Sequence, residues 1–175
     1  MIMAPGVRKL ALTAHVTSSV GTLGAVAGFL ALAVAGLAAK DSQMVRAAYL
    51  AMELTAWYVI VPLVLASLVT GLVVSLGTNW GLFRHYWVVA KLLLNILVTV
   101  VLLLQLNLIG YLSDIAAETT FSSVDLRELR ISPVIHAAGG LLVLLVPAAL
   151  SLYKPRGLTP YGWRKQHEGS TAPQR

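Results

Sequence analysis

The residues that could carry chemistry are a few ionisable side chains set within long apolar stretches. They are His15, Glu53, His85, Lys91 and His136. In apolar surroundings such a side chain is costly, so it must pair with another group or face a polar cavity, and it marks a functional site by default. Imidazoles bind metal ions or transfer protons, whereas a lysine neutralises an acidic ligand. These five residues are therefore the first candidates for binding or catalysis.

His15 is followed along the same stretch by Gly21, Gly24 and Gly28. Glycines at this spacing allow close packing of helices, which is one explanation of the pattern. They also leave room for a flat macrocycle beside a ligating imidazole, which is the other. Packing does not account for His15 itself, which needs a partner in lipid, so a ligand or proton-handling role stays open beside the packing explanation.

Lys91, Asn95 and Thr99 follow one another at intervals of four residues, so they form one polar stripe on a helix. The stripe must face protein rather than lipid. Asn and Thr can hold helices together by hydrogen bonds while Lys91 reaches toward the membrane interface. Alternatively, Lys91 neutralises an anion, such as a haem propionate.

Several kinds of chemistry find no support in the sequence. The chain has no cysteine, which excludes disulfides, thiolate metal sites and cysteine nucleophiles. His–Glu–His zinc motifs, phosphate-binding glycine loops and Ser/His/Asp sets are missing from the sequence. The sequence therefore assigns no reaction.

The composition points to a membrane. Of the 175 residues, 58% are hydrophobic and only 11% are charged, whereas a soluble domain carries about 25% charged residues. The net charge of +6 does not indicate nucleic-acid binding, because the basic residues flank apolar runs instead of gathering with aromatics on one face. The lipid bilayer is the expected partner.

Four apolar stretches are long enough to cross a bilayer, at about residues 10–37, 47–76, 86–109 and 131–153. Backbone groups in lipid must be satisfied within the segment, so the stretches are predicted to be helices. We therefore expect an all-α fold: an antiparallel bundle of four transmembrane helices over residues 1–153, with Pro62 kinking the second helix. Residues 154–175 form a basic, polar tail.

The distribution of Lys and Arg predicts the orientation. With the N-terminus inside, the inner segments hold eight basic residues and the outer segments hold four. Both termini are therefore predicted to be cytoplasmic, in a multi-pass protein of the cell membrane. The inner eight are Arg8, Lys9, Arg84, Lys154, Arg156, Arg164, Lys165 and Arg175, and the outer four are Lys40, Arg46, Arg127 and Arg130.

The predicted spans place the candidate residues at two depths. His15 and His136 differ in depth by roughly 20–25 Å at 1.5 Å per residue, so one metal ion cannot bridge them. The inner cluster consists of His15, Arg84, His85 and Lys91, and the outer cluster consists of Met52, Glu53 and His136. The inner cluster has more of what a haem needs, namely imidazole ligands, cations and a neighbouring glycine face.

Several short motifs resemble the CopD/HemJ-like group of small membrane proteins. They are His15 with its glycines, Pro62 followed by Thr70-Gly71, and the run Trp87–Leu94. The segments Phe83–Trp87 and Tyr153–Gly162 resemble an uncharacterised actinobacterial integral-membrane family of that group. HemJ-like members are haem b proteins linked to protoporphyrinogen oxidation, and CopD-like members are linked to copper handling. The resemblance carries over to His15 and Lys91, whereas Gly28–Ala33 departs from the HemJ-like pattern.

The leading expectation is a haem b protein that could take part in redox or haem-related chemistry. His15 is the expected axial ligand, Lys91 and Arg84 the expected charge partners, and His85 a candidate for the second axial ligand. Another membrane or redox protein is a possible partner. Two alternatives stay open: a non-catalytic accessory subunit, and a copper-handling protein with metal-ligand candidates His136, Met52 and Glu53 on the outer side.

Overall fold

The computed structural model describes residues 3–77, 82–117, 127–153 and 157–164, and its long elements are all helices. Four helical segments are long and apolar enough to cross a membrane. The first is α1 (Pro5–Ala38), and the second joins α2 (Ser42–Thr55), η1 (Ala56–Ile60) and α3 (Val61–Gly77). The third is α4 (Tyr86–Ala117) and the fourth α5 (Arg127–Tyr153). The predicted all-α fold with four long apolar helices is confirmed.

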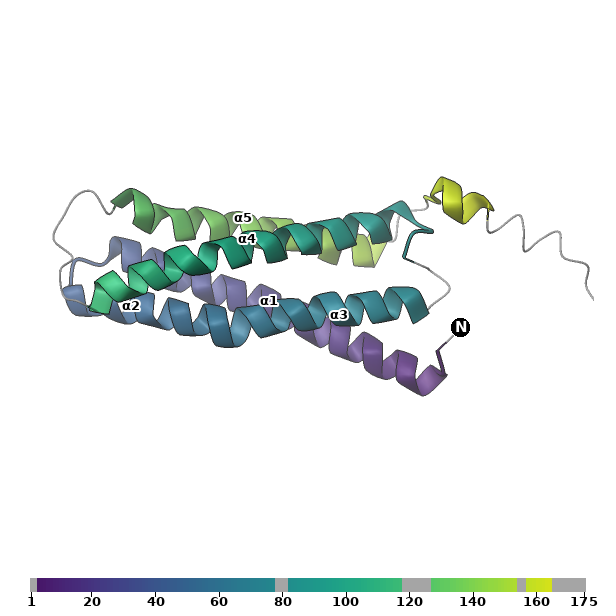
Figure 1. Cartoon of the computed structure of the whole chain (residues 1–175), viewed down its shortest axis with the longest axis horizontal. Helices are drawn as coiled ribbons and strands as arrows, with labels where there is room; N and C mark the ends of the chain where they lie inside the picture. Colours follow the sequence, from purple (N-terminus) through teal and green to yellow (C-terminus); the bar gives the residue numbers. More distant parts are fainter. Residues whose placement is uncertain (1–2, 78–81, 118–126, 154–156, 165–175) are drawn as a thin grey trace, which may run out of the picture.

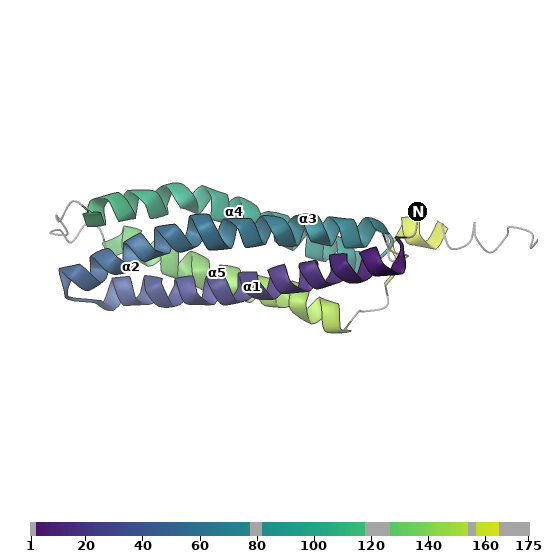
Figure 2. The same ribbon diagram turned by 90° about the horizontal axis from the view of Figure 1, so that it is seen from below.

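The helices form a bundle in which sequence neighbours run antiparallel (Figure 1). Both α1 and α4 pack against the α2–α3 segment and against α5, so α1 and α4 lie diagonally across the bundle. Pro5, Gly77, Tyr86 and Tyr153 lie at one end, here called the cavity end. The opposite end, where α1 and α4 finish and α2 and α5 begin, is called the clasp end. Figure 2 shows the same two ends from below.

Local signals explain where two helices begin. Pro5 occupies the first turn of α1, where its missing N–H costs no hydrogen bond and its fixed φ suits a helix. Asp41 precedes α2, and its side chain accepts a hydrogen bond from the backbone N–H of Gln43 at 3.2 Å. An acceptor at this position satisfies one of the free N–H groups of the first turn.

The second span passes Pro62 through a π-helical turn. The N–H of Val61 bonds to the carbonyl of Ala56, five residues back. Pro62 has no N–H to donate, and its ring would clash with the preceding turn of a regular α-helix. The wider turn at Ala56–Ile60 accommodates it. The helix therefore continues from Ser42 to Gly77 with this turn inside it.

The helices extend beyond the predicted spans. The second begins at Ser42 instead of residue 47, and α4 continues to Ala117, eight residues past the predicted end at 109. Both additions carry polar residues, such as Asp114 and Arg46. Hydropathy marks the part of a helix that sits in hydrocarbon, whereas the backbone hydrogen bonds continue into the polar interface.

The tightest part of the core lies at the clasp end. Tyr49, Met52, Leu112 and Ser113 are almost completely buried. Tyr49, Met52 and Leu112 pack in one cluster with Ala33 of α1 and with further apolar residues of α2 and α4. At the cavity end, in contrast, the buried residues include the polar side chains Ser18, Thr22 and Ser67.

Part of the tail folds back onto the start of α4. Thr159 donates its backbone N–H to the carbonyl of Arg84 at 3.0 Å, and His85 pairs with Leu158. A Cβ atom on Gly162 would lie 2.3 Å from the Arg84 carbonyl oxygen, so only glycine fits there. Residues 157–164 are thus in contact with the bundle, while residues 154–156 and 165–175 of the predicted tail lie outside the described residues.

Candidate functional site

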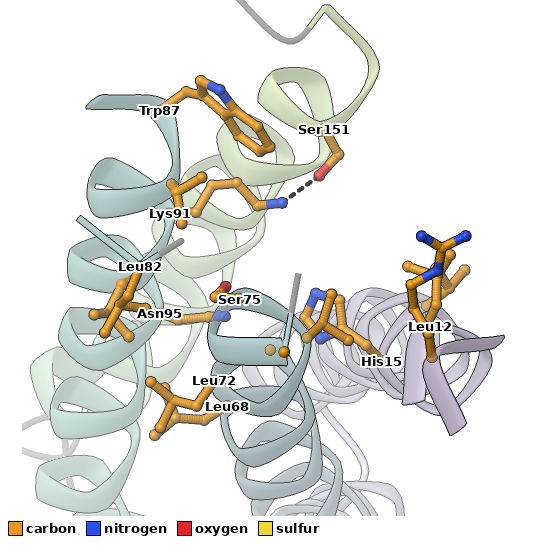
Figure 3. Close-up of a pocket in the computed structure, with 17 residues that line it drawn as sticks. Leu12, His15, Leu68, Leu72, Ser75, Leu82, Trp87, Lys91, Asn95 and Ser151 are labelled. Atoms are coloured by element: carbon orange, nitrogen blue, oxygen red, sulfur yellow. Dashed lines mark hydrogen bonds between the residues drawn. The ribbon is translucent and has the colours of Figure 1, made fainter. Parts of the chain in front are cut away.

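A cavity of about 740 Å³ opens at the cavity end between α1, α3 and α4. Most of its lining is apolar, with leucines and valines from all three helices. Its polar residues come from four helices, so only the folded bundle brings them together (Figure 3). They are Arg8 and His15 of α1, Ser75 of α3, Lys91 and Asn95 of α4, and Ser151 of α5.

His15 is held against α3 by a hydrogen bond to the backbone. Its Nδ1 lies 3.0 Å from the carbonyl oxygen of Ser67 and 3.3 Å from the hydroxyl oxygen of Thr70. A carbonyl oxygen only accepts, so Nδ1 carries the proton and donates it. In the neutral ring Nε2 then has the lone pair. This is the arrangement typical of a metal-ligating histidine, whose second nitrogen donates to a carbonyl and fixes the ring.

Gly71 makes room for the imidazole. A Cβ atom at this position would lie 3.0 Å from Cε1 and 3.3 Å from Nδ1 of His15. Real Cβ atoms rarely come so close, so any side chain would displace the ring. The Thr70-Gly71 pair therefore positions His15, through the hydroxyl of one residue and the missing side chain of the next.

Lys91 lines the same cavity as His15, from α4 (Figure 3). Its ammonium group donates to the Ser151 hydroxyl at 2.6 Å and lies 5.3 Å from the centre of the Trp87 ring. The hydroxyl oxygen and the electron-rich face of the ring both stabilise the positive charge. Asn95, one turn further along α4, lines the same cavity. The structure thus places His15, Lys91 and Asn95 around one space.

A smaller cavity of about 70 Å³ continues from the large one into the bundle. His15, Lys91, Asn95 and Ser151 line both. The small cavity adds three hydroxyl groups, from Ser19, Thr22 and Ser67, and the hydroxyls of Ser19 and Ser67 lie 2.8 Å apart. A space of this size with several polar partners can hold water.

Two residues of the predicted inner cluster lie elsewhere. Arg84 and His85 do not line the cavity. They belong to the segment that pairs with residues 157–162, and the His85 ring lies 6.2 Å from that of Trp87. The structure therefore brings His15 and Lys91 together but leaves Arg84 and His85 at the rim of the bundle. Arg8 lines the cavity as well, although in the sequence it indicates only the orientation in the membrane.

The predicted outer cluster is also divided. His136 is exposed and lines a separate cavity, Met52 is completely buried in the core, and Glu53 is half-buried. Neither Met52 nor Glu53 lines the cavity of His136. Within the described part of the chain, no three His, Asp or Glu side chains lie close enough to hold a metal ion together.

The glycines of α1 do not line the cavity. Gly21 packs against Leu63, where a Cβ atom would lie 3.3 Å from the leucine side chain. Gly24 and Gly28 are exposed, with open space around the position of a Cβ atom. The space beside His15 comes instead from glycines of α3, because Gly71 and Gly77 line it.

A polar contact at the clasp end was not expected from the sequence. Arg130 of α5 donates to the hydroxyl of Tyr49 at 3.2 Å and to the carbonyl of Gly36. Its guanidinium also lies 5.9 Å from the centre of the Tyr49 ring. This contact, here called the Arg130 clasp, joins α5, α2 and the end of α1. In the sequence Arg130 stands beside a predicted span, where basic residues normally flank a membrane.

Comparison of this chain with protein-family models, with curated proteins and with solved structures finds no match.

Proposed function

We propose that this chain is a multi-pass membrane protein that binds haem b in the cavity at the cavity end, with His15 as an axial ligand. The observation that best supports this is the state of His15. Its Nδ1 is tied to the Ser67 carbonyl, its ring lines the cavity, and Nε2 keeps the lone pair that a metal ion needs. The HemJ-like resemblance of the sequence points to the same ligand.

The rest of the lining fits a large apolar ligand with acidic groups. The volume of about 740 Å³ lies within the range of about 300–1,000 Å³ that ligand cavities usually have. Leucine and valine side chains would cover the apolar faces of such a ligand, while Arg8 and Lys91 would neutralise its propionates. When bound, haem b would supply one-electron redox chemistry or gas binding, and the chain would supply orientation, charge and exclusion of water.

The first experiment is an absorption spectrum of the detergent-purified protein, oxidised and then reduced with dithionite, beside a His15→Ala variant. We expect a Soret band with reduced α and β bands in the unsubstituted protein, and their loss or shift in the variant. A protein that stays colourless after expression with ample haem would overturn the proposal. The polar contacts of the cavity end would then be those of an accessory subunit.

His85→Ala is the matched control in the same experiment. Since His85 does not line the cavity, we expect its removal to leave the spectrum unchanged. A loss of the bands equal to that in His15→Ala would instead make His85 the second axial ligand, as the sequence pattern allowed. The two variants thus separate one ligating histidine from two.

We propose further that the cavity end faces the cytoplasm of a cell membrane. In support, Pro5 and the end of α5 lie at the same end of the bundle, and the basic residues are more numerous in the segments of that end. The chain has no cysteine, so single cysteines can be introduced without background. An impermeant maleimide should label Lys40→Cys in intact cells and Arg164→Cys only after lysis, and the reverse pattern would refute this orientation.

A further inference from the structure

A second cavity, distinct from the proposed haem site, lies between α4 and α5 toward the clasp end. Its volume is about 270 Å³, and valines, leucines and isoleucines form most of its wall. Two polar side chains line it, Gln105 from α4 and His136 from α5. Leu97 and Ile135, which also line it, are exposed on the outside of the bundle, so the cavity can be entered from the surrounding lipid.

The two polar side chains lie at the same level of the bundle. Lys91 of α4 bonds to Ser151 of α5, which sets the register of these antiparallel helices. Moving 14 residues along α4, from 91 to 105, corresponds to moving from 151 to 137 along α5. Gln105 is therefore level with the neighbour of His136. Gln105 and this neighbour, Ala137, are about 21 Å from the level of Lys91, at 1.5 Å per residue.

The hydrogen bonds of His136 determine what its free nitrogen can do. Nδ1 lies 2.8 Å from the carbonyl oxygen of Ser132, one turn back on α5, and 3.2 Å from the Ser132 hydroxyl. The carbonyl accepts, so Nδ1 donates. Nε2 of the neutral ring is then an acceptor, and it can take a hydrogen bond from a hydroxyl group of a ligand.

Gln105 offers the complementary groups. Its amide has both donors and an acceptor, and among the described residues it has no hydrogen-bond partner. An amide in an apolar environment costs free energy unless it is paired. A ligand with oxygen atoms at this level would pair it.

Part of the cavity wall carries no side chains. Gly139 and Gly140 form part of one wall, and a Cβ atom on either would meet nothing within 4 Å. The volume lies just below the range of about 300–1,000 Å³ that is typical for drug-sized ligands, which leaves room for one or two rings. An attached hydrocarbon chain would leave past Leu97 and Ile135 into lipid.

From these contacts we infer that the cavity binds the ring of a lipid-soluble quinol, with one hydroxyl donating to Nε2 of His136 and an oxygen pairing with the Gln105 amide. The quinol is favoured over a plain hydrocarbon because two polar groups at one level face an otherwise apolar space. It is favoured over a charged ligand because no charged side chain of the described chain lines the cavity. The inference concerns binding alone and does not depend on haem.

The test uses native mass spectrometry of the full chain released from detergent, with three probes that share a decyl chain. They are decylhydroquinone, its dimethyl ether, which keeps the oxygens but lacks the O–H donors, and decylbenzene. We expect decylhydroquinone to bind at least about fivefold more tightly than either of the others, since one hydrogen bond contributes about that factor. Equal affinities would show that the cavity takes only a hydrocarbon chain, which would overturn the inference.

Variants locate the site. His136→Phe and Gln105→Leu keep the cavity apolar and filled, and each should reduce the preference for the hydroquinone about fivefold. Gly140→Leu should fill the cavity and abolish binding of all three probes. Gly24→Leu is the matched control, because Gly24 also has open space around it but lies on α1, away from this cavity. A preference that survives both polar substitutions would place the quinol elsewhere and refute the inference.

Discussion

The two ends of the bundle are built in different ways. At the clasp end the interior is filled by large side chains with almost no exposed surface, such as Tyr49, Met52 and Leu112, and the Arg130 clasp joins three helices. At the cavity end the interior contains hydroxyl groups, His15 and Lys91 around an open space. Apolar packing without voids gives stability, whereas a polar cavity gives a place to bind a ligand. The tightest packing and the cavity that contains His15 are thus located at opposite ends of the bundle.

This division explains why buried polar groups are tolerated. Several polar side chains at the cavity end have a partner on a facing helix: Ser67 pairs with Ser19, and Lys91 with Ser151. In lipid such bonds contribute only about 0.6 kcal/mol each on average. They keep polar groups satisfied without making that end rigidly packed. The stabilising free energy of the bundle is therefore expected to come mostly from the clasp end.

The largest effect is expected from opening a void at the clasp end. Met52 is 0% exposed, and Met52→Ala should lower the free energy of unfolding by about 3 kcal/mol, because removal of buried methylenes leaves a cavity. Met44, on the same helix, is 55% exposed, so Met44→Ala should change it by less than about 0.5 kcal/mol. Unfolding by SDS in mixed micelles measures both. Similar losses in the two variants would contradict the assignment of the core to this end.

A smaller loss is expected from breaking the Arg130 clasp. Arg130→Leu removes hydrogen bonds to Tyr49 and to the Gly36 carbonyl, and should cost about 2 kcal/mol of unfolding free energy, as is typical for bonds to charged groups. Exposed Arg46 on α2 provides the control Arg46→Leu. A double-mutant cycle with Tyr49→Phe isolates the contact, and additive effects would show that Arg130 and Tyr49 are not coupled.

At the cavity end, a substitution should affect ligand binding more than stability. Gly71→Ala places a Cβ atom 3.0 Å from the His15 ring, so the ring must move. We expect haem affinity to fall about tenfold, as when a supporting contact of a metal ligand is lost, with about 1 kcal/mol of unfolding free energy lost. Haem titration of the apoprotein measures the first quantity. Gly24→Ala, where the space is open, should leave the affinity unchanged, and an equal decrease there would count against His15.

The smallest effect is expected for Ser67→Ala. The substitution removes the hydroxyl contact with Ser19 but keeps the backbone carbonyl that accepts from His15. The free energy of unfolding should fall by about 0.6 kcal/mol, and the haem spectrum should not change. A loss above about 2 kcal/mol in the same SDS titration would mean that the cavity end contributes as much to stability as the clasp end.

Much of the fold follows from the apolar runs alone. The four long helices, their antiparallel order and the polar stripe of Lys91 and Asn95 are evident from hydropathy and from the period of a helix. The positions where helices end are less evident. Residues 110–117 carry Ser113 and Asp114 and read as a loop, yet Ser113 is buried against the bundle. Tertiary packing keeps this segment helical where hydropathy gives no signal.

The partners of the candidate residues could not be found in the sequence. The predicted spans put His15, Lys91 and His85 at a similar depth in the membrane. Depth alone does not determine which face of a helix a residue occupies. His85 is paired with Leu158 of the tail instead. Conversely, the partner of His15 is a backbone carbonyl at Ser67, and a carbonyl has no sequence signature. Two short motifs, at residues 83–87 and 157–162, turn out to contact each other, which only the folded chain shows.

The π-helical turn at Ala56–Ile60 sets how far α3 is rotated about the helix axis relative to α2. A turn of this kind holds one residue more than a regular helical turn, so every residue after it is rotated by about 100° relative to an uninterrupted α-helix. Met52 before the turn and Ser67 after it are both buried. If the same residues formed a regular α-helix instead, the clasp end would stay in place but Ser67, Thr70 and Gly71 would swing away from His15. The π-helical turn is therefore as much a requirement of the cavity as the identity of the residues that line it.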